Sequence, residues 1–329
     1  MDNLKGKSIL LLSPKFFNYE IEIVNALKVA GASVVWIDER PSNTFFTKAI
    51  IRLNKNFLKR KIKNYYNSVL KQISDKQKHF DFIFIISPET LTPTILTSIK
   101  TQYLNAKVIL YMWDSFKNKG ALELLPLVDR AISFDKNDAQ QYDLSFRALF
   151  YIDAYKKQSI AFRYDLLFTG TAHSDRYNFV KRLVAKIPEL NVKLFFYLSS
   201  KKLFWAKKLS DKEFKSIKLS DISFIPLNHK TTADLVHRSK IILDINHPNQ
   251  VGLTMRTLET LGAQKKLITT NSDIVNYDFY NENNFLLIDR ENPVMPNTFI
   301  NSEYVPTESE LLIKYSIHGW VCDVFQLNL

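Results

Sequence analysis

Glycine and cysteine are scarce in this sequence of 329 residues, which contains seven glycines and one cysteine. The glycines form neither G-x-G-x-x-G nor G-x-x-x-x-G-K-[ST], so the usual dinucleotide fingerprint and the P-loop are both absent. The lone Cys322 excludes an intramolecular disulfide and is compatible with a reducing compartment. Anion binding in this chain must therefore use helix N-termini, backbone N–H groups and Lys or Arg side chains.

Other signatures are missing too. The sequence has no D-x-D pair for a divalent metal, no zinc spacing among its six His and one Cys, and no G-x-S-x-G. No apolar run approaches the ~20 residues that span a bilayer, and the run near the start is too short for a signal peptide. We therefore expect a cytoplasmic protein that requires neither metal nor another cofactor.

Positive charge is concentrated in one segment. Ten lysines and arginines lie between Lys48 and Lys78, against Asp75 alone, and they supply most of the net charge of +12. Apolar residues recur in the same segment at roughly helical spacing, flanked by Tyr65 and Tyr66. Such a basic amphipathic segment suits contact with an anionic membrane surface or a polyanion. The alternative is a solvated face on an ordinary docked helix.

Short apolar runs alternate with helical patterns along the chain, which is typical of an α/β fold with parallel sheets. Strands are predicted first in one half and then in the other, at 8–13, 33–38, 80–87, 106–114, 130–135, 146–152, 165–170, 192–199, 222–227, 241–246, 266–270 and 284–289. The polar stretch 153–164 separates the halves, so we predict two Rossmann-like domains at 1–155 and 156–306. A helix at 307–329 is expected to cross back to the first domain. Ligands of such sheets bind beyond the carboxyl ends of the strands, here in a cleft between the domains.

One of these strand-end loops leads into the segment VGLTMRTLETLGAQKKLITT at 251–270. The predicted helix starts near Gly252 or Thr254 and carries Arg256 in its first turn. Its N-terminus offers unpaired N–H groups and partial positive charge, which together with Arg256 favour an anion. Glu259 can accept two hydrogen bonds, as a ribose diol would offer. The alternative for these two side chains is an i,i+3 ion pair.

The segment MRTLETLGAQKKLITTN, with the following DIVNYDFYNENNFLLIDR, resembles the donor-binding region of GT-B glycosyltransferases. It resembles in particular the CgeB-like and GT4-like bacterial group, associated with lipopolysaccharide or capsule biosynthesis. The resemblance implies that Glu259 binds the nucleotide ribose and that Gly252, Thr254 and Arg256 face the diphosphate. GT4-like enzymes carry an acidic residue eight positions before this Glu, and here that position is Val251. Retaining or inverting stereochemistry is therefore left open.

Further donor-binding candidates lie in other loops of the second half. Gly170 would permit close backbone approach, and charged or polar side chains follow three strands. These candidates are His173, Arg176, Lys201, Lys202 and Asn249. The resemblance to GT-B proteins adds Leu227, which would contact the base through backbone atoms. For the basic residues, the alternative is an ordinary solvated side chain.

The acceptor candidates come from the first half. Asp114, at the end of a central strand, could deprotonate an acceptor hydroxyl, and Glu89 is the alternative base. Trp113 offers a flat surface for a sugar ring, while Phe17 and Asn18 could line the acceptor channel. A helix cap for Asp114 and a core position for Trp113 are the structural alternatives.

The sequence thus predicts a GT-B glycosyltransferase that moves a sugar from a nucleotide-diphosphate donor to a glycan or glycolipid acceptor. Surface-polysaccharide assembly at the inner face of the cytoplasmic membrane is the expected setting, with residues 48–78 against the anionic leaflet. The alternatives are a nucleotide-sugar epimerase of the same architecture and a non-catalytic protein that binds nucleic acid or another polyanion. No recognition module for nucleic acid is visible, so no nucleic-acid partner is expected.

Overall fold

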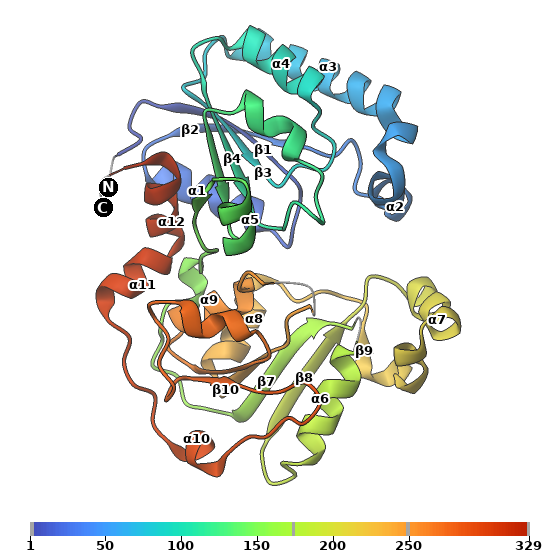
Figure 1. Cartoon of the computed structure of the whole chain (residues 1–329), viewed down its shortest axis with the longest axis vertical. Coiled ribbons are helices and arrows are strands. Elements are labelled where there is room, and N and C mark those ends of the chain that lie inside the picture. Colours follow the sequence, from blue (N-terminus) through green and yellow to red (C-terminus); the bar gives the residue numbers. More distant parts are fainter. Residues whose placement is uncertain (1–2, 173–174, 248–250, 328–329) are drawn as a thin grey trace. The chain divides into compact units, whose positions relative to one another are not determined.

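The computed structural model describes residues 3–172, 175–247 and 251–327. The chain forms two compact units, Met1–Ala148 with Ile317–Leu329, and Leu149–Ser316. Each unit contains a six-stranded sheet in which every pairing is parallel (Figure 1). This arrangement confirms the predicted α/β class with two Rossmann-like halves.

The sheet of the first unit has the order β2-β1-β3-β4-β5-β6. Its strands are β1 (Ser8–Ser13), β2 (Ser33–Asp38), β3 (Phe82–Ile86), β4 (Lys107–Met112), β5 (Arg130–Ser133) and β6 (Ser145–Phe146). Its helices are α1 (Tyr19–Val29), α2 (Phe45–Asn54), α3 (Lys59–Lys76), α4 (Pro93–Gln102), α5 (Lys136–Gln141) and α12 (Ile317–Phe325), with 3-10 turns η1 (Lys55–Leu58) and η2 (Leu122–Leu127). The basic segment predicted near 48–78 thus becomes α2, η1 and α3.

Helices cover both faces of this sheet, which explains why its strands are apolar almost throughout. On one face, α3 and α4 contribute Ile62, Tyr66, Leu96 and other buried residues to a core with alternate strand residues. On the other face, Trp320 of α12 packs edge-on against Tyr111, with ring centroids 4.9 Å apart. The connecting loops lie at the carboxyl ends of the strands.

The sheet of the second unit has the order β12-β11-β10-β7-β8-β9. Its strands are β7 (Tyr164–Thr171), β8 (Val192–Tyr197), β9 (Ile222–Ser223), β10 (Ser239–Asp244), β11 (Lys266–Thr269) and β12 (Phe285–Leu287). Its helices are α6 (Arg176–Ala185), α7 (Lys201–Ser210), α8 (His229–His237), α9 (Met255–Gly262), α10 (Asn297–Asn301) and α11 (Ser309–Tyr315), with 3-10 turns η3 (Asp153–Tyr155), η4 (Lys212–Ser216), η5 (Leu219–Asp221) and η6 (Ser272–Asn276).

Several strands are shorter than the sequence predicts, and two of them are reduced to two residues, β6 and β9. The predicted strand 146–152 joins the sheet only through β6, since the carbonyls of Arg147 and Ala148 accept hydrogen bonds from the phenol of Tyr111, and Tyr151 forms a separate bridge with Ser316. The predicted strand 222–227 ends at Ser223, whose hydroxyl bonds both the N–H and the carbonyl of Ile225. Pro226, which lacks an N–H group, follows directly.

The domain bounds and the C-terminal helix also differ from the expected ones. The division falls between Ala148 and Leu149 rather than after residue 155. The predicted helix at 307–329 is two helices, because Ser316 has extended backbone (φ −72°, ψ 161°) between α11 and α12. Its α11 stays in the second unit, and α12 belongs to the first.

None of the helices in the described part of the chain combines the length and the apolarity needed to cross a lipid bilayer.

Candidate functional site

The start of α9 is fixed at the carboxyl end of β10 by one buried carboxylate. Asp244, the last residue of β10, accepts hydrogen bonds from the hydroxyls of Thr254 (2.6 Å) and Thr257 (2.9 Å). Thr254 is also the N-cap of α9, since its hydroxyl accepts from the N–H of Thr257. The positive end of the α9 dipole is therefore held at the sheet edge where ligands of parallel sheets bind.

Arg256 and Glu259 form the ion pair that the sequence left as an alternative. Arg256 Nη1 lies 2.6 Å from Glu259 Oε2, and the exposed fractions of the two side chains are 18% and 3%. Tyr155 of η3 is hydrogen-bonded to both, and burial together with the charge of Glu259 raises the pKa of its phenol well above the usual value. Arg256 thus remains partly exposed, whereas the carboxylate of Glu259 is covered.

Two more arginines lie at the same sheet edge. Arg290, which follows β12, pairs with Asp175 at 2.7 Å and donates to the carbonyl of Asn246. Arg176, in the first turn of α6, donates to the hydroxyl of Thr171 at the end of β7 (3.2 Å). Burial lowers the pKa of Arg176, and the charge of the neighbouring Arg290 lowers it further. The charge of Asp244 offsets part of this decrease. The loops after β7, β10 and β12 therefore converge on one cluster.

This cluster, which we call the arginine edge, consists of Arg176, Arg256 and Arg290 around the N-terminus of α9. Arg256 pairs with Glu259, Arg290 pairs with Asp175, and Arg176 is attracted by Asp244 and Asp175, so three guanidinium groups are matched by three carboxylates. The helix N-terminus adds partial positive charge; its first turn holds no acid, and the nearby carboxylate of Asp244 is bonded to the hydroxyls of Thr254 and Thr257. A phosphate or diphosphate group is the kind of ligand that guanidinium groups and helix N-termini bind together.

The remaining donor candidates are spread over the second unit. His173 and Asn249 lie outside the described residues. Gly170 lies near the end of β7, and a Cβ there would be 2.9 Å from the ring of Phe168. Packing against Phe168 therefore explains the glycine without a ligand. Gly252 is buried, and its carbonyl accepts from the side chain of Asn271 at 3.3 Å. Lys201 and Lys202 are exposed at the start of α7, whereas Leu227 is half-buried before the N-cap of α8.

In the first unit, the acceptor candidates lie at the carboxyl ends of β1 and β4. The ring of Phe16 lies 5.7 Å from that of Trp113, and Phe16 and Phe17 are 43% and 49% exposed. Phe17 and Asn18 have φ values of 49° and 66°, a strained conformation for residues other than glycine. Strain of this kind is concentrated at functional sites, and here it holds an aromatic surface open to solvent.

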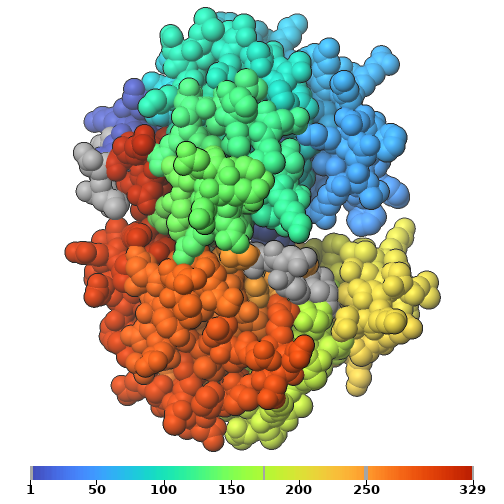
Figure 2. Space-filling view, viewed as in Figure 1, coloured from blue at the N-terminus to red at the C-terminus, as the bar shows by residue number. Residues whose placement is uncertain are grey.

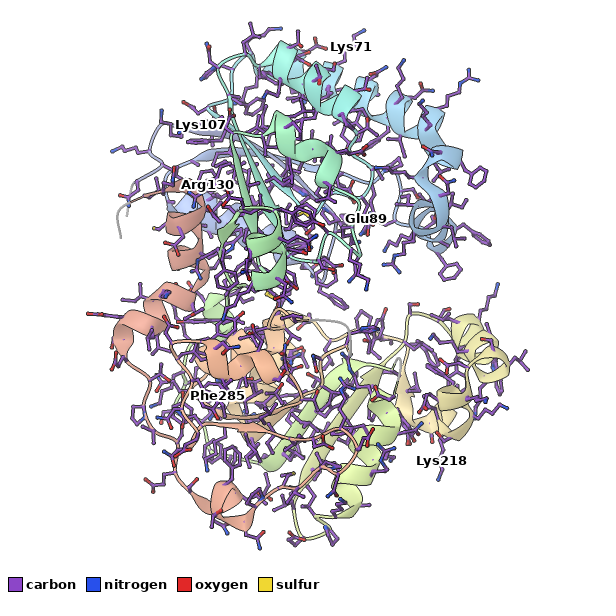
Figure 3. The ribbon with its side chains drawn as sticks, in the orientation of Figure 1. Lys71, Glu89, Lys107, Arg130, Lys218 and Phe285 are labelled. Atoms are coloured by element: carbon purple, nitrogen blue, oxygen red, sulfur yellow. The ribbon has the colours of Figure 1, made fainter. Side chains whose placement is uncertain are left out.

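Asp114 and Glu89 differ sharply in their surroundings. Asp114 is half-buried, and its Oδ1 accepts from the N–H of Ser115 and the side-chain amide of Asn118, both at 3.0 Å. The side chain of Glu89 is only 4% exposed and pairs with Arg40 (2.6 Å) and with Lys119. Figure 3 shows Glu89 at the carboxyl end of the sheet, opposite Lys107 and Arg130 at the starts of β4 and β5. Glu89 is thus paired with two cations, whereas Oδ1 of Asp114 accepts hydrogen bonds from neutral groups.

Sequence reasoning missed four residues of the arginine edge and its support: Tyr155, Asp244, Asn246 and Arg290. A signal existed for Asn246 and Arg290, because they stand at the end of the predicted strand 241–246 and just after the predicted strand 284–289. Tyr155 gave no such signal, because it lies in the stretch that separates the predicted domains.

No protein-family model matches the sequence, and no curated protein matches it. Among solved structures, HepE from Anabaena, determined in complex with UDP and glucose, is similar, with a TM-score of 0.56 and 10% identity over 97% of this chain and 99% of that chain. The lipopolysaccharide outer core galactosyltransferase WaaB is similar too, with a TM-score of 0.51 and 11% identity over 97% of this chain and 99% of that one. The chain has the GT-B fold. UDP-GlcNAc 2-epimerase from Methanocaldococcus jannaschii shares it, with a TM-score of 0.51 and 13% identity over 97% and 99% of the two chains.

Proposed function

We propose that the chain is a glycosyltransferase that moves a sugar from a nucleotide-diphosphate donor to a glycan or glycolipid acceptor. The observation that carries the proposal is the arginine edge, where Arg176 acts on Asp244 and Arg290 contacts Asn246 beside the loop that leads into α9, and Arg256 stands in the first turn of that helix. The GT-B fold supports it, because HepE, which has a similar structure, was determined with UDP and glucose.

In this proposal the arginine edge binds the diphosphate and stabilises the charge that develops on the departing nucleotide. Arg176 and Arg290 come from loops after different strands and can contact different phosphate oxygens, and Arg256 adds the third guanidinium group. Positioned cations of this kind lower the barrier because they are held in place before the reaction. The mechanism assigns no step to a metal ion or another cofactor, and Leu227 would contact the base through its backbone.

Glu259 would bind the ribose, as the resemblance implies. With a side chain 3% exposed, it could do so only by exchanging Arg256 or Tyr155 for the ribose hydroxyls. Exchange of Arg256 would free its guanidinium group for the diphosphate. Arg256 and Glu259 would then pair with each other in the empty protein and contact the donor when it is bound.

On the acceptor side, Asp114 would remove the proton from the attacking hydroxyl if the reaction inverts the sugar. Its Oδ1 is oriented by two hydrogen bonds at the end of β4, beside the aromatic surface of Phe16 and Trp113. A sugar ring stacked on that surface would bring its hydroxyl groups to the carboxylate.

We further propose that residues 48–78 hold the protein to an anionic membrane surface during the synthesis of lipopolysaccharide or capsule. Within this segment Leu53 and Phe57 are 85% and 81% exposed among lysines and arginines. The segment forms part of the surface of the first unit (blue in Figure 2). Exposed apolar side chains among cations are typical of helices that lie on anionic lipid.

A thermal-shift screen against nucleoside mono- and diphosphates and their sugar conjugates tests the donor assignment. A ligand at 100 times its Kd stabilises the folded state by about 2.7 kcal/mol. We expect one family of diphosphates to raise Tm clearly and the matching nucleoside to have little effect. Absence of any response would contradict the proposal.

The epimerase of similar structure makes epimerisation of a sugar nucleotide the second candidate. An epimerase changes its sugar nucleotide without an acceptor, whereas a transferase leaves the sugar configuration of the remaining donor unchanged. NMR of the best-binding sugar nucleotide, incubated with the protein alone, separates the two. A new sugar configuration would favour the epimerase.

A further inference from the structure

A second group of cations lies in the first unit, at the carboxyl ends of β2 and β3. The side chain of Arg40, 7% exposed, contacts Glu89 through Nε at 2.6 Å, while Lys119 contacts the other oxygen of the same carboxylate. The carboxylate of Glu89 thus pairs with two cations. The charges of Arg40 and Arg52 also act on Lys119, which places Arg52 of α2 in the same group.

Lys48 and Arg52 bring further positive charge to this place. They are four residues apart on α2 and so share one face of the helix. Within the described residues, the side chain of neither makes a hydrogen bond or an ion pair, although the backbone N–H of Lys48 donates to the carbonyl of Thr44. Lys48 is half-buried; burial lowers the pKa of its amine, and the charges of Arg40 and Arg52 add to the decrease. Like charges thus converge where an anion would stabilise them.

The neighbouring acids offset only part of this positive charge: Glu39 Oε1 lies 3.7 Å from Nε of Arg40, and the charge of Asp38 acts on Lys48. Glu39 is completely buried, and its carboxylate accepts from the N–H and the hydroxyl of Thr90, at 2.7 Å and 2.9 Å. Burial raises the pKa of Glu39, which weakens its hold on a negative charge. Asp38 accepts from the N–H of Arg40 and from the side-chain amide of Asn43. Four cations therefore face Glu89 and two acids that are already engaged.

Apolar side chains stand beside these cations. Phe45 and Phe46, in the first turn of α2, are 60% and 78% exposed, with ring centroids 6.0 Å apart. They precede Lys48 by two and three positions on the same short helix. A ligand that contacts both groups needs an anionic head and an apolar chain.

We infer that Arg40, Lys48, Arg52 and Lys119 form a binding site for a phosphate group of an amphiphile, whose apolar chain lies against Phe45 and Phe46. The inference rests on the proposed function, and it makes the acceptor a phosphate-bearing glycolipid. The phosphate contacts the two cations without carboxylate partners and displaces neither of the pairs made by Glu89.

Calorimetric titration with monomeric dodecyl phosphate, below its micelle concentration, tests the site. Inorganic phosphate and dodecyl glucoside, which carry only the head or only the chain, are titrated in parallel. We expect dodecyl phosphate to bind the wild-type protein at least about tenfold more tightly than either, because only it satisfies both groups.

The variants K48Q and R52Q, alone and combined, remove the unpartnered cations. We expect each to weaken dodecyl phosphate binding about tenfold, since a hydrogen bond to a charged group has this size. The matched control is K61Q with K63Q, which removes the same charge from exposed positions of α3. Circular dichroism of each variant checks that the fold is intact.

Three results would overturn the inference. An equal loss in the control and in K48Q/R52Q would mean diffuse attraction to the basic segment. Equal binding of inorganic phosphate would exclude an amphiphile, and equal binding of dodecyl glucoside would exclude a phosphate site. Nucleotide binding by the second unit is measured in the same samples, so a failure of this site is distinguishable from a failure of the proposed function.

Discussion

Gly262, the last residue of α9, lies directly against the ring of Tyr151. A Cβ at this position would be 2.5 Å from Cγ and Cδ2 of the ring. The ring is itself held, because the phenol donates to the carbonyl of Leu312 at 2.7 Å and the backbone N–H donates to Tyr315. The contact therefore fixes the far end of the helix whose start carries Thr254 and Arg256.

Gly262→Ala should destabilise the protein by about 1–3 kcal/mol, because overpacking forces the ring or the helix to move. The matched control is Gly120→Ala, where an added Cβ meets nothing within 4 Å. Urea unfolding of both variants measures the difference. Equal stability of the two variants would mean that Tyr151 moves aside without cost.

Asp114→Asn should lower the transfer rate at least about 100-fold, because the amide cannot accept a proton. The substitution retains the oxygen that Ser115 and Asn118 contact, so the fold and the nucleotide affinity should not change. Initial rates and nucleotide Kd values, measured side by side, provide the check. An unaltered rate would remove Asp114 from the mechanism and leave its role as a turn residue.

At the scale of elements, one pattern recurs at the amino ends of the strands. Asp81, just before β3, accepts from the N–H of Ser8 at the start of β1 (2.8 Å), and Asp129 does the same for Val108 of β4 (2.6 Å). In the second unit, Asp165 accepts from the N–H of Asn191 (2.9 Å). Aspartates thus stabilise the edge opposite the candidate sites, where adjacent strands begin.

The first of these contacts makes stability depend on pH. Burial opposes the ionisation of Asp81, but the N–H and hydroxyl of Ser8 and the amine of Lys7 outweigh it and lower the pKa of Asp81 to about 2. A carboxyl pKa below its unfolded value stabilises the fold above that value, and the contribution disappears as pH falls from about 4 to 2.

Asp81→Asn should therefore cost about 1–2 kcal/mol at neutral pH, and the difference from the wild type should shrink below pH 4. The control is Asp75→Asn, an exposed residue of α3. Chemical denaturation across this pH range measures both. A deficit that is constant with pH would show that ionised Asp81 contributes nothing.

Most elements could be predicted because their signals are local. The run SILLLS and its counterparts are typical of strands buried on both faces, and Gly31, with φ of 96°, lies just beyond the end of the first helix. The break at Ser316 could not be predicted, since the residues on both sides favour a helix and only the division between units separates them.

At the scale of the whole molecule, the two units repeat one architecture, and the alternation of strands and helices was enough to predict it. The candidate site was only partly predictable. Arg256 and Glu259 lie in one helix, so the sequence alone could indicate that they act together. It could also indicate the alternative, an ion pair between them. Arg290 and Asp175 are 115 positions apart and meet only because β12 and β7 belong to one sheet. Pairing across such a distance leaves no pattern in a single sequence.

Calorimetric titration of the nucleoside diphosphate that gives the largest thermal shift tests the arginine edge most directly. The wild type is compared with Arg176→Gln and with Arg182→Gln, which removes an exposed arginine from the same helix. We predict at least about tenfold weaker binding for Arg176→Gln, the size of one charged hydrogen bond, and no change for Arg182→Gln. Unchanged affinity in Arg176→Gln, or a wild type that binds no nucleoside diphosphate, would contradict the account.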